Sequence, residues 1–392
     1  MLRALAVIAL LCGSLRAETV LVLPFFNQSK SASLDWIGES IAESLHDSLT
    51  SEGLLVLDRE DRLEAYRRLS LRSGVELTHA SVIKIAQSLD ASSVIFGYFD
   101  VTPAGAQDPA AASLRVDVRI LDLKQLRRFP DFMEARALQD LAALEAHLAW
   151  QALERLTPQT APGEQAFMRA RPPVRLDAVE SYIRGLLAQT PEQRQRFFIQ
   201  AARLDEHYSQ PCFQLGMTYW ANKDYQDAAN WLSRVDRSNP HFLEAQFFLG
   251  LCGYYSADFA GAERAFQLVA ATVPLNEVFN DLGAAQARRN ESAEALASFQ
   301  KALEGDDADP DYRFNMGYVY WKTGKFTEAV ASLRAVLERN PSDAEATTLL
   351  GRALKHDGPR PGDPKTEARE RLKTNYEEAA YRQLQAELHA QH

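Results

Sequence analysis

The chain has 392 residues, which is enough for two or three domains that each bury a hydrophobic core. Apolar residues make up 46% of the chain and charged residues 24%, the balance of an ordinary soluble globular protein. The formal net charge of −10 disfavours nucleic acid and anionic membrane surfaces as partners, because both bind basic protein faces.

The first residues have the three-part pattern of a secretory signal peptide. Arg3 supplies a positive charge, residues 4–15 are almost wholly apolar, and Ala17 is a small residue suited to cleavage. We therefore expect residues 1–17 to be a signal peptide and the mature protein to be exported, either to the periplasm or outside the cell. A membrane anchor is an alternative, but a helical span needs about 20 apolar residues. Lipidation of Cys12 is another, which the large residue before it disfavours.

Residues 18–156 alternate between apolar runs typical of buried strands and amphipathic runs typical of helices. We expect strands at 19–26, 54–57, 93–99 and 114–121. We expect helices at 35–50, 61–71, 82–89 and 138–156. The small, Ala-rich run at 103–113 predicts a loop. Strands interleaved with helices predict an α/β domain.

Three stretches of this domain resemble the amino-terminal domain of TolB and FlgO-like proteins of the bacterial envelope. They are Val20-Leu-Val-Leu-Pro-Phe25 with Asn27, Asp35-Trp36-Ile37-Gly38-Glu39, and Ala91-Ser-Ser-Val-Ile-Phe-Gly97. The resemblance implies a periplasmic or surface location and a role in assembly, and it identifies no ligand. Four prolines in residues 157–174 predict a linker and hinge after this domain.

A repeat of 33 or 34 residues organises the rest of the chain. A Leu-Gly or Met-Gly pair recurs at 215–216, 249–250, 282–283, 316–317 and 350–351. Three further series keep step with these pairs: Ala228, Ala262, Ala295 and Ala329; Leu232, Phe266, Phe299 and Leu333; and Pro240, Pro274 and Pro341. Small residues let two antiparallel helices touch, the large residues fill the space toward the next pair, and proline ends each unit. Stacked helix pairs of this kind bury one continuous core.

This pattern resembles the tetratricopeptide repeat (TPR), so we expect an all-α superhelical solenoid over 175–343. Its units lie near 175–208, 209–242, 243–275, 276–309 and 310–343. The third full unit departs from the pattern, because Asp307 stands where the closing proline belongs. Residues 344–392 then predict a degenerate repeat and a capping helix from Thr366. An apolar stripe marks this helix: Leu372, Tyr376, Ala380, Leu384 and Leu388.

Nothing in the sequence has the pattern of a catalytic or metal site. The chain contains no Gly-x-Ser-x-Gly or His-Glu-x-x-His motif, and its eight histidines are scattered. Thr323-Gly324-Lys325 falls in the turn inside a repeat, where a phosphate-binding loop is not expected. We therefore expect no enzymatic activity, no cofactor and no metal. Cys212 and Cys252 can form a bridge in principle, but their repeat positions favour two buried free thiols.

The TPR resemblance implies a concave groove lined by the first helix of each unit, where a partner segment would bind. The groove positions are Phe213, Met217, Trp220, Phe247, Leu251, Tyr254, Tyr255, Asn280, Arg288, Phe314, Tyr318, Trp321 and Lys322. Aromatic residues anchor protein interfaces, so this groove suits an extended or helical apolar segment. The alternative is that these side chains pack inside the superhelix or against the amino-terminal domain.

Together these features predict an exported, non-catalytic scaffold that binds a protein or peptide partner in its repeat groove. The chain would not span the membrane after signal cleavage, and its amino-terminal domain would associate with the cell envelope. The alternative is a self-associating structural component of the envelope in which the repeats act as spacers.

Overall fold

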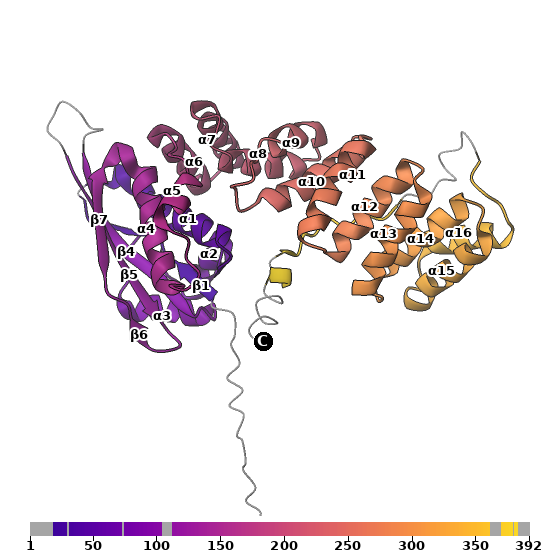
Figure 1. Cartoon of the computed structure of the whole chain (residues 1–392), viewed down its shortest axis with the longest axis horizontal. Coiled ribbons are helices and arrows are strands. Elements are labelled where there is room, and N and C mark those ends of the chain that lie inside the picture. Colours follow the sequence, from indigo (N-terminus) through magenta and orange to yellow (C-terminus); the bar gives the residue numbers. More distant parts are fainter. Residues whose placement is uncertain are drawn as a thin grey trace, which may run out of the picture.

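The computed structural model describes residues 19–29, 31–72, 74–103, 112–360, 370–378 and 380–382 (Figure 1). The expected signal peptide with Cys12, most of the expected loop at 103–113, and the end of the expected capping helix lie outside these residues. A sheet domain occupies one end of the elongated molecule and a helical array the other (Figure 1). Over the described ranges, none of the helices has both the length and the apolar character needed to cross a bilayer.

The sheet of the amino-terminal domain is mixed. Its strands follow the order β3 (Leu55–Val56), β1 (Thr19–Val22), β4 (Ser93–Thr102), β5 (Ser113–Asp122) and β6 (Arg127–Arg128). Strand β1 is parallel to both neighbours, whereas β5 runs antiparallel to β4. Two strands lie off this path: β2 (Phe26–Asn27) pairs with β4, and β7 (Phe132–Ala137) pairs with β5. Strands β6 and β7 were not expected, because their residues are mostly charged or half-exposed and lack an apolar run.

Helices cover both faces of this sheet. Helices α1 (Trp36–Ser51) and α4 (Leu141–Leu156) share a buried cluster with Val20 and Val22 of β1. Helices α2 (Arg59–Arg68) and α3 (His79–Ser88) share a second cluster with Leu21 and Leu23. Successive residues of a strand point to opposite faces, so one apolar run serves both layers. The expected α/β domain is confirmed.

The array consists of consecutive helix pairs. The pairs are α6 (Leu176–Leu187) with α7 (Pro191–Leu204), α8 (Gln210–Ala221) with α9 (Tyr225–Leu232), α10 (Phe242–Tyr255) with α11 (Phe259–Thr272), α12 (Asn276–Arg288) with α13 (Ser292–Gly305), and α14 (Pro310–Lys322) with α15 (Phe326–Arg339). Helix α10 begins one residue before the expected unit 243–275. Helix α16 (Ala344–Leu354) follows the last pair. The expected all-α solenoid is confirmed.

The glycines at 216, 250, 283 and 317 each lie against the large residue on the second helix of their own unit. A Cβ added at Gly250 would lie 2.7 Å from the ring of Phe266, and a Cβ at Gly216 would lie 2.5 Å from Leu232. We had expected these large residues to fill the space toward the next pair. The structure instead places them over their own glycine, so they set the distance between the two helices of one unit.

The expected linker at 157–174 is fixed to the sheet domain. It contains helix α5 (Glu164–Arg169), whose Phe167 is buried in the main core. The Arg171 guanidinium donates to the main-chain oxygen of Ser48 at 3.2 Å and to Glu52 Oε1 at 2.8 Å, both at the end of α1. These contacts hold the segment in one position, which differs from the hinge that its prolines suggested.

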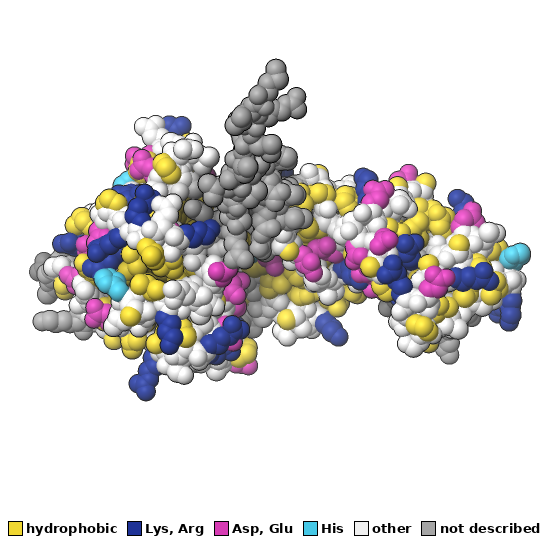
Figure 2. Space-filling model, turned by 90° about the horizontal axis from the view of Figure 1, so that it is seen from below, with side chains coloured by type: hydrophobic (Ala, Val, Ile, Leu, Met, Phe, Trp, Pro, Cys, Tyr) yellow, Lys and Arg dark blue, Asp and Glu magenta, His cyan; other side chains and the backbone are white. Residues whose placement is uncertain are grey.

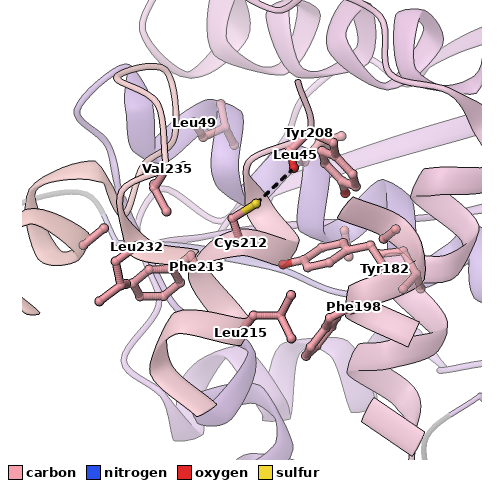
Figure 3. Packing of buried hydrophobic residues seen from close by; sticks show 14 of the residues in the cluster. Leu45, Leu49, Tyr182, Phe198, Tyr208, Cys212, Phe213, Leu215, Leu232 and Val235 are labelled. Atoms are coloured by element: carbon pink, nitrogen blue, oxygen red, sulfur yellow. Dashed lines mark hydrogen bonds between the residues drawn. The ribbon is translucent and has the colours of Figure 1, made fainter. Parts of the chain in front are cut away.

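The sheet domain and the first repeats share one hydrophobic core. Leu45 and Leu49 of α1 pack near Tyr208 and Cys212 of the array (Figure 3). Cys212 and Cys252 are both buried and free, as expected. Because apolar side chains from both parts are buried together, the junction is part of the folded core.

A cavity of about 150 Å³ lies at this junction and contains buried carboxyl groups. Glu145 of α4 accepts a hydrogen bond from Ser40 Oγ at 2.6 Å, and burial raises its pKa to about 8. Burial also raises the pKa of Glu43 to about 7. A carboxyl group removed from water favours its neutral form, so the junction is adapted to protonated side chains.

We predict that the junction makes the free energy of unfolding fall as pH rises. In the unfolded chain Glu145 ionises near 4.5, whereas the folded protein keeps it protonated to about pH 8. The folded state therefore binds more protons between these values, and stability is lost as pH increases through that window. The glutamine of Glu145→Gln can still form a hydrogen bond with Ser40 but cannot ionise. The decrease in the free energy of unfolding with pH should therefore be smaller by roughly 2–4 kcal/mol, since one pKa unit corresponds to about 1.4 kcal/mol.

Urea unfolding at pH 5 and pH 8 measures the effect. The control is Glu154→Gln, which changes an exposed glutamate on the same helix and should leave the pH dependence as in the parent. Equal pH dependence in Glu145→Gln and the parent would contradict the assignment.

A second prediction concerns the helix contact inside each unit. Gly250→Ala should destabilise the protein by about 1–3 kcal/mol, because its Cβ would overlap the buried ring of Phe266. Gly351→Ala occupies the equivalent position in α16, where nothing lies within 4 Å of the new Cβ. Gly351→Ala should stabilise the protein by about 0.5–1 kcal/mol, because alanine has a higher helix propensity than glycine. Thermal melts of both variants check the pair, and shifts of the same sign would refute the packing argument.

Candidate peptide-binding surface

Residues 370–378, here called the tail segment, lie against the first helices of the later repeats. Residues 370–377 form neither helix nor strand. Their described contacts run from the start of α16 back to α12 and α10. The expected capping helix is therefore wrong over these residues. The main-chain groups that a helix would pair internally instead bond side chains of the array, which we call the tail-binding surface.

Two buried asparagines hold the main chain of Arg371. Asn315 Oδ1 accepts from the Arg371 N–H at 2.8 Å, and Asn315 Nδ2 donates to the Arg371 carbonyl oxygen at 2.9 Å. Asn280 Nδ2 donates to the same oxygen at 2.8 Å, and Asn315 Nδ2 also donates to Asn280 Oδ1. Both asparagines are fully buried. Such contacts satisfy a peptide group whatever its side chain, so they recognise main chain.

Two carboxyl groups extend this contact along the tail segment. The N–H of Lys373 donates to Asp281 Oδ1 at 2.9 Å, and the N–H of Glu377 donates to Glu277 Oε1 at 3.0 Å. Burial raises the pKa of Asp281 well above its usual range and also raises the pKa of Glu277. Both residues lie on α12, so this helix contributes side-chain acceptors for two main-chain N–H groups of the segment.

Acidic side chains surround the two cationic side chains of the tail segment. Asp343 accepts two hydrogen bonds from the Arg371 guanidinium, at 2.8 and 2.9 Å, and these hold the pKa of Asp343 below its usual value. The same guanidinium lies 3.6 Å from the centre of the Phe314 ring. Lys373 Nζ contacts Asp309 and Asp311, each at 2.7 Å. On the face seen from below, acidic and basic side chains lie close together on the array (Figure 2).

Glu370 and Tyr376 make the remaining contacts of the tail segment with the array. Glu370, whose side chain is fully buried, contacts Arg288 Nε at 2.7 Å and accepts from the Tyr254 hydroxyl at 2.7 Å. The Tyr376 ring stacks on Phe247 with 5.2 Å between centres. Paired and hydrogen-bonded in this way, the Glu370 carboxylate can be buried without water.

Of the expected groove residues, a subset touches the tail segment: Phe247, Tyr254, Asn280, Arg288 and Phe314. The other expected groove residues contact other parts of the array. Among the aromatic residues, Trp220 packs beside Tyr255, Phe213 stacks on His241, and Tyr318 stacks on Trp321, whose Nε1 donates to the Asp357 carbonyl oxygen. Lys322 donates to the Ala287 carbonyl oxygen, Leu251 is fully buried, and Met217 is partly buried against the core. Their role in binding stays a prediction.

The predicted groove included the polar residues Asn280 and Arg288 but missed Asp281 and Asn315. These two each directly precede the Leu-Gly or Met-Gly pair of their unit, a position that Gln214 and Phe248 hold in earlier units. Both are fully buried. Because the position is polar in one earlier unit and apolar in another, the sequence pattern alone does not mark it. The described residues contain no group of three or more histidine, cysteine, aspartate or glutamate side chains arranged to hold a metal ion.

We predict that Asn315→Ala releases the tail segment from the array. The substitution removes the acceptor of the Arg371 N–H and one of the two donors to its carbonyl oxygen, the other being Asn280, and a hydrogen bond contributes about 1 kcal/mol net. Hydrogen exchange at the Arg371 amide should become roughly 5- to 10-fold faster, with amides in α6 and α8 unchanged. Asn222→Ala, an exposed asparagine of the array, is the control. Unchanged exchange at Arg371 in Asn315→Ala would contradict the described contact.

Comparison with known proteins places the repeats in a family. A family model for the tetratricopeptide repeat matches residues 213–276, and a second such model matches residues 287–353. The anaphase-promoting complex subunit CDC16 of Saccharomyces cerevisiae is 26% identical over 167 residues, which are 41% of this chain and 20% of that protein. The tetratricopeptide repeat-containing protein trd-1 of Caenorhabditis elegans is 23% identical over 195 residues, 46% of this chain and 25% of that protein. The chain thus spans a quarter or less of these relatives.

Solved structures that are similar to this chain include MamA and YrrB. MamA from Desulfovibrio magneticus is 22% identical, with 41% of this chain and 92% of that chain covered and a TM-score of 0.37. YrrB, described as a TPR protein with an unusual peptide-binding site, is 19% identical, with coverages of 50% and 97% and a TM-score of 0.35. The resemblance of residues 18–156 to the TolB amino-terminal domain stays a prediction. Residues 213–276 and 287–353 of this chain are tetratricopeptide repeats.

Proposed function

We propose that the protein is an exported, non-catalytic scaffold whose repeat array binds a non-helical segment of a partner protein on the tail-binding surface. One observation carries this proposal. The surface holds residues 370–377 as a peptide without helix or strand: Asn280 and Asn315 donate hydrogen bonds to its main chain, and Asp281 accepts one from it. Main-chain contacts are common to all peptides, so a segment from another protein can make them too.

The tail segment acts in this proposal as a built-in occupant that a partner replaces. A segment attached to the same chain has a high effective concentration at its site, on the order of millimolar for a short flexible connection. A partner therefore binds detectably only if it makes additional contacts or if the hold on the tail segment is weakened. This competition keeps the buried asparagines paired until a partner arrives.

The amino-terminal domain supplies the envelope association in this proposal. Its resemblance to TolB-like domains and the signal-peptide pattern of residues 1–17 support a periplasmic or secreted location. The shared core at the junction supports a fixed spacing between this domain and the array.

A self-associating envelope component with the repeats as spacers is the second candidate. The observation in its favour is that the chain's own tail segment already fills the tail-binding surface. Sedimentation of the parent protein separates the two candidates, because the spacer role requires an oligomer without any partner.

Three forms of the full mature chain test the scaffold proposal by affinity capture from an envelope extract. They are the parent, the tail variant Arg371→Ala with Lys373→Ala, and the tail variant that also carries Asn280→Ala and Asn315→Ala. We expect a specific protein to be retained about 10-fold more by the tail variant than by the parent, and to be lost when the asparagines are also replaced. Circular dichroism melts establish that all three forms are folded.

Retention of the same proteins by all three forms would show that binding occurs elsewhere on the chain. A captured protein counts as a partner only if a synthetic peptide with the sequence of residues 370–378 competes with it, since both would occupy the same surface.

A further inference from the structure

We propose that the tail-binding surface selects a partner segment by its residue pattern: an acidic residue, a cationic residue, an apolar residue, and a second cationic residue. This is the pattern of Glu370-Arg371-Leu372-Lys373. The inference rests on the proposed function and adds the chemistry of the partner to it. Two walls of the surface, one acidic and one basic, carry the argument.

The acidic wall gathers carboxylates from two neighbouring helix starts. Asp309 and Asp311 lie at the start of α14, and Asp343 and Glu345 lie at the start of α16. Asp309 accepts from the N–H of Asp311, and Asp343 accepts from the N–H of Ala346, so both cap their helices. Because helix formation itself brings these negative charges together, the wall is present whatever occupies it. A cationic occupant relieves their mutual repulsion.

The wall fixes the spacing between the two cationic residues. Asp311 contacts both cationic side chains, Arg371 at 3.2 Å and Lys373 at 2.7 Å. Leu372 between them packs against the hydrophobic core instead. Successive residues of an extended peptide point to opposite sides, so residues i and i+2 point to the same side and can share one acidic wall. Two adjacent cationic residues would direct one charge at the apolar surface.

The first cationic site favours arginine over lysine. The Arg371 guanidinium forms a two-bond contact with Asp343, reaches Glu345 at 3.2 Å, and lies flat enough to approach the Phe314 ring centre at 3.6 Å. A planar fork can make these contacts together, whereas an ammonium group is a single point of charge. The second site contacts Lys373 through its single Nζ atom.

The basic wall explains the acidic residue before the first cation. Arg288 Nε and the Tyr254 hydroxyl both contact Glu370 Oε2, and the Arg288 Nε also lies 3.2 Å from the Tyr254 oxygen. The Glu370 side chain has no exposed surface. Its Oε2 makes these contacts, and its other oxygen, Oε1, is buried without a hydrogen bond. An apolar side chain at this place would leave the partly buried Arg288 without its carboxylate.

Peptide binding to the full-length tail variant Arg371→Ala with Lys373→Ala tests this pattern. The probe is a fluorescent peptide with the sequence of residues 370–378, measured by anisotropy at low salt. One comparison peptide exchanges the places of Arg371 and Leu372, which keeps composition and net charge but makes the cations adjacent. Another replaces Glu370 by Ala, and a third replaces Arg371 by Lys. We expect each to bind at least 10-fold more weakly than the probe.

A second variant, altered in the acidic wall, tests the charge pattern independently of the folding of the tail variant. Asp311→Asn with Asp343→Asn, added to the tail variant, removes two charges, and asparagine at 343 can still cap α16 as aspartate does. The preference for the probe over the exchanged peptide should then fall by at least 5-fold. Circular dichroism should show the helix content of the parent in both proteins.

The outcomes separate this inference from the proposed function. If all peptides bind the tail variant equally and Asn280→Ala with Asn315→Ala abolishes binding, the surface binds peptide main chain and the charge pattern is overturned. If no peptide binds a folded tail variant, the proposed function fails together with the pattern. If the probe binds the parent as tightly as the tail variant, the tail segment does not occupy the site in solution, which also overturns the inference.

Discussion

The close approach of two helices at the glycines of the paired units is the contact on which the repeat array depends. The rings of Phe266 and Phe299 occupy the space that a side chain at Gly250 or Gly283 would need. Because this contact recurs with the repeat period, the first helices of successive units come to lie side by side. Asn315 and Asn280, which differ by one residue in repeat position, lie on two such helices and are joined by a hydrogen bond. The polar groups that hold the tail segment thus depend on the helix stacking that builds the core.

These polar groups need an occupant for a physical reason. Asn280, Asp281 and Asn315 are fully buried with the tail segment in place, and buried polar groups destabilise a protein unless they are paired. The main chain of Arg371 and Lys373 supplies the missing donors and acceptor. Without an occupant these side chains would turn to water at the inner surface. A segment that binds there therefore gains hydrogen bonds from groups that are already ordered by the helices beneath them.

The sequence was sufficient for the fold class and insufficient for the binding surface. Apolar periodicity predicted the α/β domain and the solenoid, because burial of whole faces leaves a regular pattern. Leu372, Tyr376 and Ala380 have the spacing of a helix, yet the pattern does not reveal that the main chain of residues 371–377 bonds side chains from α12 and α14. Many expected groove aromatics, such as Trp321, are buried between helices, since a solenoid needs large side chains there. Which aromatic faces a partner depends on superhelix geometry that one sequence does not contain.

The tail segment also links the binding surface to the junction with the sheet domain. Arg382, four residues beyond it, lines a cavity with Thr50 and Ser51 of α1 and with Arg237 of the array. Glu378, at the end of the segment, contacts Arg382 through its side chain. The tail segment thus connects the tail-binding surface to the cavity beside α1, in addition to the core that the two parts of the protein share.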